Sequence, residues 1–154
     1  MKILKKILVR FLAITTSVVY LSAVAQAESV INKEHQAVVE TAYNYFNGLA
    51  NADQELIAKA FDMDFGHAKI VSLDKETGKE TIKTYTFKEF ATFFKKPNDT
   101  WTAKILSVDI VSDKMAMVKM DFDTPKNNYI DYLVMYKRDN VWRIISKTFS
   151  ATKK

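Results

Sequence analysis

Two residues of this sequence, His67 and Asp131, have side chains that can move a proton and stand in apolar surroundings. His67 follows Gly66, and the ordinary imidazole pKa of about 6.5 permits proton transfer near neutral pH. Asp131 lies within the stretch Tyr-Ile-Asp-Tyr-Leu-Val, where a carboxylate requires a partner or a pocket. If both side chains faced one cavity, they could act as acid and base in an isomerase- or cyclase-type reaction.

Each of these residues also has a structural explanation. His67 could be a histidine held by a hydrogen bond where a strand begins, with no chemical role. Asp131 could face outward and pair with Lys119 or Lys147 across a sheet. The spacing of His67 and Asp131 along the chain leaves the catalytic and the structural explanation open, because it does not determine whether the two side chains face one cavity.

Aromatic residues could line a binding pocket and stack on a flat ligand. The candidates are Tyr43, Phe46, Tyr85 and Trp142. Together with His67 and Asp131 they form the predicted ligand-binding set, although the four aromatic side chains could equally belong to the core.

Several kinds of site are missing from the sequence. The chain has no cysteine, which excludes disulfides, thiolate metal ligands and cysteine nucleophiles. Glycine occurs only at positions 48, 66 and 78, so there is neither a phosphate-cradling loop nor a dinucleotide fingerprint. The two histidines, His35 and His67, stand outside any cluster with the spacing of metal ligands. We therefore expect neither a cofactor nor a metal ion.

The N-terminus has the pattern of a cleavable secretory signal, residues 1–27. Four basic residues stand before an apolar run over residues 11–24, and Ala25-Gln26-Ala27 supplies the small residues that signal peptidase requires. The run has 14 residues, whereas a membrane-spanning helix needs about 20. We expect cleavage before Glu28, no stable membrane anchor afterwards, and an exported protein that is periplasmic or secreted.

The predicted signal also accounts for the basic charge of the chain. Residues 1–27 hold four of the 23 Lys and Arg residues and none of the 18 Asp and Glu residues. The remaining residues therefore carry 19 basic and 18 acidic side chains. A nearly neutral chain does not have the charge typical of nucleic-acid binding, so we expect no nucleic-acid partner.

The elements that must position the candidate residues begin with helices. Apolar residues at positions 38, 39, 42, 43, 46, 49 and 50 predict one helix, and Asp53 is placed to cap a short second one. Thr86-Phe87-Lys88-Glu89 is a capping-box pattern that predicts a third helix, ending at Pro97.

Strands account for most of the rest of the chain. Alternating apolar residues and turn-forming residues predict strands over 68–73, 80–85, 104–111, 114–123, 129–137 and 141–149. In the strand over 104–111 we expect Leu106, Val108 and Ile110 on one face. Helices come first and a long meander follows, which predicts an α+β class and one domain over residues 28–154.

Two segments resemble a known family. Residues 129–133, a turn and residues 141–149 with Trp142 resemble the ending of the putative lumazine-binding family, in the nuclear transport factor 2-like superfamily (polyketide cyclase/ketosteroid isomerase-like). Tyr45-Phe46-Asn47-Gly48 followed by Asp53 resembles a second motif of that family. The resemblance implies a cone-shaped, curved antiparallel sheet wrapped around N-terminal helices. It implies no particular reaction, because this scaffold hosts isomerases, cyclases, dehydratases and non-catalytic binders.

Three functions follow as alternatives. We expect an apolar cavity between the concave sheet and the first and third helices, which binds a small, partly aromatic molecule without transforming it. The second alternative is an acid–base enzyme that uses Asp131 and His67. The third is a domain that forms a homodimer or binds a partner through the outer face of the sheet.

Overall fold

The computed structural model describes residues 28–73, 76–95 and 99–154, so the expected signal over residues 1–27 and Pro97 lie outside the described residues. Residues His35–Lys154 form one compact unit, and the described residues 28–34 lie outside it. Within the described ranges, no helix is long and apolar enough to cross a membrane.

A helix over residues 28–51 supplies the first layer of the core. Within the compact unit its buried hydrophobic side chains are Val38, Ala42, Tyr45 and Leu49, each at most 1% exposed. They recur every three or four residues, as on one face of a helix. This buried face differs from the predicted one. Phe46 was predicted to be on it and is only half-buried, whereas Tyr45, which was not predicted to be on it, is buried.

The motif around Gly48 has a packing reason. A Cβ atom on Gly48 would lie only 2.9 Å from the backbone nitrogen of Ile57 in α2 (Gln54–Ala60). Only glycine therefore lets the first helix and α2 approach this closely. Asp53 caps α2 as predicted, because its carboxylate accepts hydrogen bonds from the backbone N–H groups of Glu55 and Leu56.

The third helix, α3 (Phe87–Ala91), begins with the predicted capping box. The Thr86 hydroxyl accepts from the Glu89 N–H at 3.2 Å, and the Glu89 carboxylate accepts from the Thr86 N–H at 2.8 Å. α3 ends at Ala91, so the predicted extension to Pro97 was wrong. The backbone N–H and the hydroxyl of Thr92 both donate to the Glu89 carbonyl, which tightens and ends the last turn.

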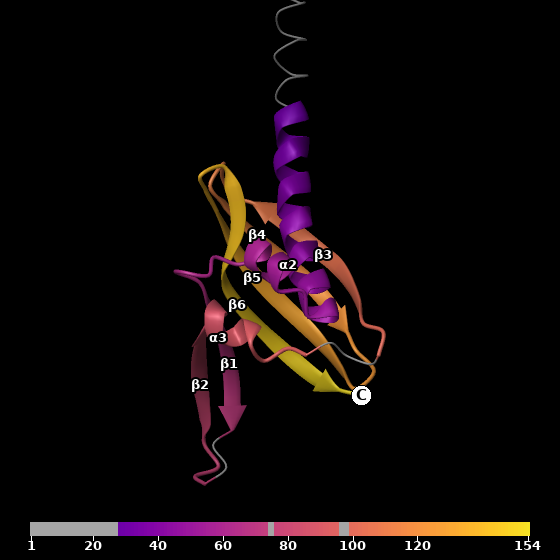
Figure 1. Cartoon of the computed structure of the whole chain (residues 1–154), viewed down its shortest axis with the longest axis vertical. Coiled ribbons are helices and arrows are strands. Elements are labelled where there is room, and N and C mark those ends of the chain that lie inside the picture. Colours follow the sequence, from indigo (N-terminus) through magenta and orange to yellow (C-terminus); the bar gives the residue numbers. More distant parts are fainter. Residues whose placement is uncertain (1–27, 74–75, 96–98) are drawn as a thin grey trace, which may run out of the picture. The chain divides into compact units, whose positions relative to one another are not determined.

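Among the described residues, six strands form one curved sheet in the order β2-β1-β6-β5-β4-β3 (Figure 1). Their bounds are β1 His67–Leu73, β2 Glu80–Thr86, β3 Thr102–Ile110, β4 Met115–Asp123, β5 Asn127–Arg138 and β6 Val141–Lys153. Neighbouring strands are antiparallel except β1 and β6, which run parallel. A parallel bridge between Phe61 and Ile144 already places the chain beside β6 before β1 begins. The α+β fold with a curved sheet and N-terminal helices is confirmed, and one junction in the sheet is parallel.

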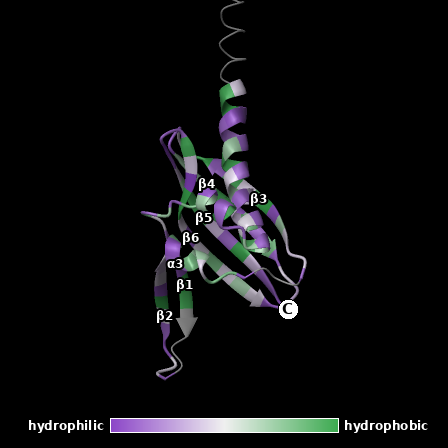
Figure 2. Cartoon of the chain, in the orientation of Figure 1, coloured by the Kyte–Doolittle hydropathy of each residue, from purple (hydrophilic) through white to green (hydrophobic). Residues whose placement is uncertain are grey.

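Buried residues alternate with more exposed ones along β4 as predicted, since Ala116, Val118, Met120 and Phe122 are all buried. Hydrophobic and hydrophilic residues alternate along the strands in Figure 2. In β3 the prediction for Leu106 was wrong, because this side chain is 41% exposed. The pairing with β4 shifts by one residue between Ile105 and Ser107, which makes Leu106 the extra residue of a β-bulge.

Candidate functional site

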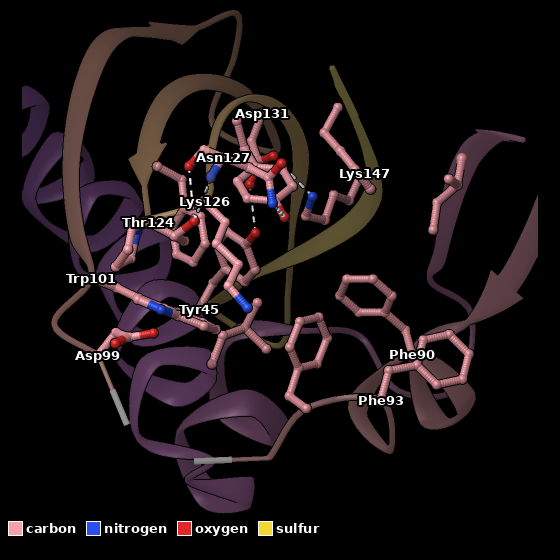
Figure 3. A pocket seen from close by; sticks show the side chains of 17 residues that line it. Tyr45, Phe90, Phe93, Asp99, Trp101, Thr124, Lys126, Asn127, Asp131 and Lys147 are labelled. Atoms are coloured by element: carbon pink, nitrogen blue, oxygen red, sulfur yellow. Dashed lines mark hydrogen bonds and ion pairs between the residues drawn. The ribbon is translucent and has the colours of Figure 1, made fainter. Parts of the chain in front are cut away.

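A pocket of about 470 Å³ opens between the sheet, the first helix and the segment around α3 (Figure 3). This volume lies within the range of about 300–1,000 Å³ that is usual for small-molecule sites. Most of its lining is apolar and aromatic, including Phe90, Phe93, Trp101, Phe122 and Phe149. A flat apolar molecule could therefore pack against several ring faces and edges at once.

Three polar side chains meet at the wall of this pocket, and we call them the Tyr45–Asp131–Lys147 network. The Tyr45 hydroxyl donates to Asp131 Oδ2 at 2.5 Å, and Lys147 Nζ donates to Asp131 Oδ1 at 2.9 Å. Figure 3 shows the three side chains pointing toward one another, with these contacts dashed. Asp131 is 1% exposed and Lys147 is 3% exposed, so water hardly screens this ion pair.

Each member of the network comes from a different element. Tyr45 lies on the buried face of the first helix, Asp131 on β5 and Lys147 on β6. Asp131 has the same parity as the buried Leu133 and Met135, so the alternation of β5 directs it inward. Lys147 pairs with Leu133, and it therefore reaches Asp131 diagonally across the two strands.

Lys147 faces the pocket because of a second β-bulge. The β5–β6 pairing passes from Val134–Ser146 to Met135–Ile144, which leaves Ile145 as an extra residue in β6. Trp142 and Ile144 are buried before this bulge, and Lys147 is buried after it. Without the extra residue, Lys147 would point to the outer face.

Burial shifts the proton affinities of two members of the network. Burial raises the pKa of Tyr45 well above its ordinary value, and the nearby Asp131 carboxylate raises it further, so the hydroxyl remains a donor. Burial lowers the pKa of Lys147, although the Asp131 carboxylate opposes this shift. The amine of Lys147 therefore releases its proton more readily than a lysine in water.

Aromatic rings surround the Lys147 amine. Its Nζ lies 3.9 Å from the ring centroid of Phe149 and 5.7 Å from that of Phe90. These are cation–π distances, and such contacts stabilise a positive charge that has left water. The network thus places an acid, a base and an amine beside one another in an apolar pocket.

The pocket lining also carries polar groups outside the network. The Thr124 hydroxyl donates to the Asn127 carbonyl at 2.9 Å, and the Asn127 amide donates to the Tyr129 hydroxyl at 3.2 Å. Asp99 and Lys126 line the pocket and are exposed to solvent. No buried side-chain nitrogen or oxygen of the described residues lacks a hydrogen-bond partner. Within the same residues, no group of three His, Cys, Asp or Glu side chains could hold a metal ion.

Of the six residues predicted to form the site, Asp131 lines this pocket. His67 lies elsewhere: it precedes Ala68, which is buried beside Lys147 in the β1–β6 pairing. Successive residues of a strand face opposite sides, so His67 is directed to the face opposite Asp131. The structure therefore does not bring the predicted acid–base pair together.

The predicted aromatic residues lie behind or away from the lining. Phe46 contacts Phe122 at 5.3 Å between ring centroids, and Tyr85 contacts Phe93 at 5.0 Å. These two residues support lining residues from behind. Tyr43 is half-buried and packs against the core. Trp142 is 2% exposed, belongs to the core and borders a separate, smaller hollow.

Sequence reasoning missed Tyr45 as a member of the network. It offered Lys147 as one of two possible partners of Asp131, but on the outer face of the sheet, whereas the structure buries this ion pair at the pocket. Tyr45 has the helical spacing of Val38, Ala42 and Leu49, a signal that the sequence contains. The sequence contains no signal for the inward direction of Lys147, because this direction depends on the bulge at Ile145.

Comparisons with known proteins agree with this fold. The family model described as putative lumazine-binding matches residues 33–150. Aldolase FrzH from Cladobotryum sp is 26% identical over 125 residues, which cover 80% of this chain and 95% of that protein.

Solved structures are similar as well. An NTF2-like protein from Shewanella baltica has a TM-score of 0.64 and 24% identity, over 79% of this chain and 96% of that one. A ketosteroid isomerase-like protein from Erwinia carotovora atroseptica has a TM-score of 0.57 and 14% identity, over 80% of this chain and 99% of that one. The matched residues identify the chain as a member of the putative lumazine-binding family, and the shared architecture shows that it has the nuclear transport factor 2-like fold.

Proposed function

We propose that this domain binds a small, flat and largely apolar molecule in the pocket beside the Tyr45–Asp131–Lys147 network. The observation that carries the proposal is the combination of an aromatic lining with one polar cluster at its wall. Ligand sites commonly have this composition, since apolar surface supplies affinity and a few polar groups set orientation. The ligand's polar group would then lie against the network and its rings against Phe90, Phe93 and Trp101.

Blocking the pocket tests this proposal. Ile70 lines the pocket, whereas its neighbour Val71 is 63% exposed. We expect wild-type protein to bind the apolar dye N-phenyl-1-naphthylamine at one saturable site per chain. Ile70→Trp should weaken this binding by at least about tenfold, or ~1.4 kcal/mol, because the indole fills the space. Val71→Trp adds the same indole outside the pocket and should leave the dissociation constant unchanged, as measured by fluorescence titration.

Equal binding by the two variants would place the dye outside the pocket and contradict the proposal. Native mass spectrometry of the protein purified from its own source gives an independent measurement, since a retained ligand would appear as a fixed mass increment. The increment should disappear in Ile70→Trp and persist in Val71→Trp.

The second candidate function is an enzyme that acts on a carbonyl compound. Two observations favour it: the carboxylate, phenol and amine of the network adjoin one pocket, and the relative from Cladobotryum is an aldolase. In this version Tyr45 and Lys147 take the place that His67 was predicted to have beside Asp131. Steady release of product from a carbonyl substrate, abolished by Asp131→Asn, would distinguish an enzyme from a binding domain.

We also propose that the domain acts outside the cytoplasm, as a periplasmic or secreted protein. The support is the basic, apolar and small-residue pattern of residues 1–27. Intact mass of the exported protein is expected to match a chain that begins at Glu28. A full-length mass recovered from the membrane fraction would contradict this expectation.

A further inference from the structure

One lysine of this chain differs from its surface lysines in two respects. Lys147 is 3% exposed, and it lines the pocket with its amine beside the aromatic rings of Phe149 and Phe90. A lysine used only for solubility or a surface ion pair keeps its ammonium group in water. The amine of Lys147 instead adjoins the space that a ligand would occupy.

The geometry around this amine contains a complete path for its proton. Lys147 Nζ donates to Asp131 Oδ1 at 2.9 Å, so the carboxylate can accept the proton and leave a neutral, nucleophilic amine. The other carboxylate oxygen, Oδ2, accepts from the Tyr45 hydroxyl at 2.5 Å, which holds Asp131 in place. A buried amine with an adjacent acid–base group is the arrangement that imine formation requires.

We propose that Lys147 forms an imine with an aldehyde or ketone bound in the pocket, an inference that rests on the proposed function. The amine attacks the carbonyl carbon after it has passed a proton to Asp131. The carbonyl oxygen becomes an alkoxide, and it takes a proton from the attacking nitrogen, which gives a neutral carbinolamine. Asp131 then returns the proton to the hydroxyl group, which leaves as water while the C=N bond forms. The product is a protonated imine beside a carboxylate, so charge and atoms balance with one water released.

The residues around Lys147 also stabilise the protonated imine once it has formed. The iminium ion has the same charge as the ammonium group that it replaces, so it keeps the ion pair with Asp131. The Phe149 ring, with its centroid 3.9 Å from Nζ, stabilises the cation. The aromatic lining selects for a carbonyl carried on a flat apolar body, such as an aryl aldehyde.

Reductive trapping tests the proposal on the whole protein. We would incubate it with 6-methoxy-2-naphthaldehyde and sodium cyanoborohydride near pH 7, then measure intact mass and map the modified peptide. An exposed lysine has a pKa of about 10.4, so only about one in 2,500 such amines is neutral at pH 7. We expect one adduct per chain, at Lys147, formed at least about tenfold faster than at any exposed lysine.

Two variants and a competitor complete the experiment. Lys147→Arg retains the positive charge but cannot form an imine, so the fast adduct should disappear. Lys119→Arg is the matched control, since Lys119 lies over the Tyr132 ring and outside the pocket, and trapping should remain. If Lys147→Arg fails to fold, the alcohol 6-methoxy-2-naphthylmethanol should still slow trapping at Lys147 in the wild type while surface lysines react as before.

The outcomes separate this inference from the proposed function. If the alcohol binds in the pocket but the aldehyde labels only exposed lysines, the imine is refuted and the binding function stands. If the alcohol does not bind either, both are refuted. Fast labelling at Lys147 that the alcohol suppresses supports both.

Discussion

Replacing Lys147 with methionine is expected to lower the free energy of unfolding by about 3–5 kcal/mol. Lys147 is the ion-pair partner of Asp131, and both side chains are almost completely buried. Removing the cation leaves a carboxylate with no counter-ion in an apolar environment, which costs far more than losing a surface pair. Urea denaturation followed by circular dichroism measures this change.

The double variant Lys147→Met/Asp131→Leu should recover part of the lost stability. Replacing both members of a buried ion pair with apolar residues of similar volume is often neutral or stabilising. Recovery should fall short by about 1–3 kcal/mol, because the Tyr45 hydroxyl loses its acceptor, and adding Tyr45→Phe should remove that shortfall. Wild-type stability in Lys147→Met alone would show that the pair is not buried.

Lys119→Met is the matched control for this series. Lys119 is half-buried on β4, and its Nζ lies 5.5 Å from the ring centroid of Tyr132. Losing this cation–π contact should cost no more than about 1 kcal/mol. A loss as large as that of Lys147→Met would mean that lysine replacement in general, rather than the buried pair, causes the effect.

Trp142→Ala is expected to destabilise the domain by about 3–5 kcal/mol. The indole is 2% exposed and belongs to the core between β6 and the first helix, where the Thr41 hydroxyl contacts the Trp142 carbonyl at 3.4 Å. A domain of this size is stable by about 5–15 kcal/mol, so this loss should shift the denaturation midpoint strongly. Function plays no part in this expectation, because Trp142 lies outside the pocket.

The neighbouring residue supplies the control for Trp142. Val141 is 45% exposed, and Val141→Ala should change the free energy of unfolding by no more than about 0.5 kcal/mol. The remaining folded Trp142→Ala molecules should bind N-phenyl-1-naphthylamine as the wild type does. An unchanged midpoint in Trp142→Ala would contradict the packing of β6.

Local rules were enough to predict much of the fold. The N-cap at Asp53, the capping box at Thr86 and the alternation of β4 each depend on residues close together in the chain. The hairpin between β5 and β6 also depends on residues close together in the chain. Its residues Asp139 and Asn140 have φ angles of 52° and 62°, a conformation that Asp and Asn tolerate better than most residues.

The inward direction of Asp131 was also available from the sequence. It follows from the parity of Asp131 with Leu133 and Met135, since each strand alternates regularly as long as its register is unbroken. The sequence did not determine which face of the first helix is buried. Val38, Ala42, Tyr45 and Leu49 compete with a second apolar set that includes Phe46, and only packing against the sheet selects between them.

Cross-strand pairing offered Lys119 or Lys147 as partners of Asp131, and the tertiary structure decided that Lys147 pairs with it, on the pocket side of the sheet. One extra residue in β6, Ile145, reverses the alternation of inward and outward side chains and turns Lys147 from the outer face to the pocket. Leu106 is the extra residue of a separate bulge in β3, where it likewise reverses the alternation. A bulge arises where two strands of a curved sheet must stay paired, so its position depends on the partner strand rather than on local composition. The sequence by itself therefore determined the elements, the family and one carboxylate of the site. The amine and the phenol joined that carboxylate only when distant segments packed together.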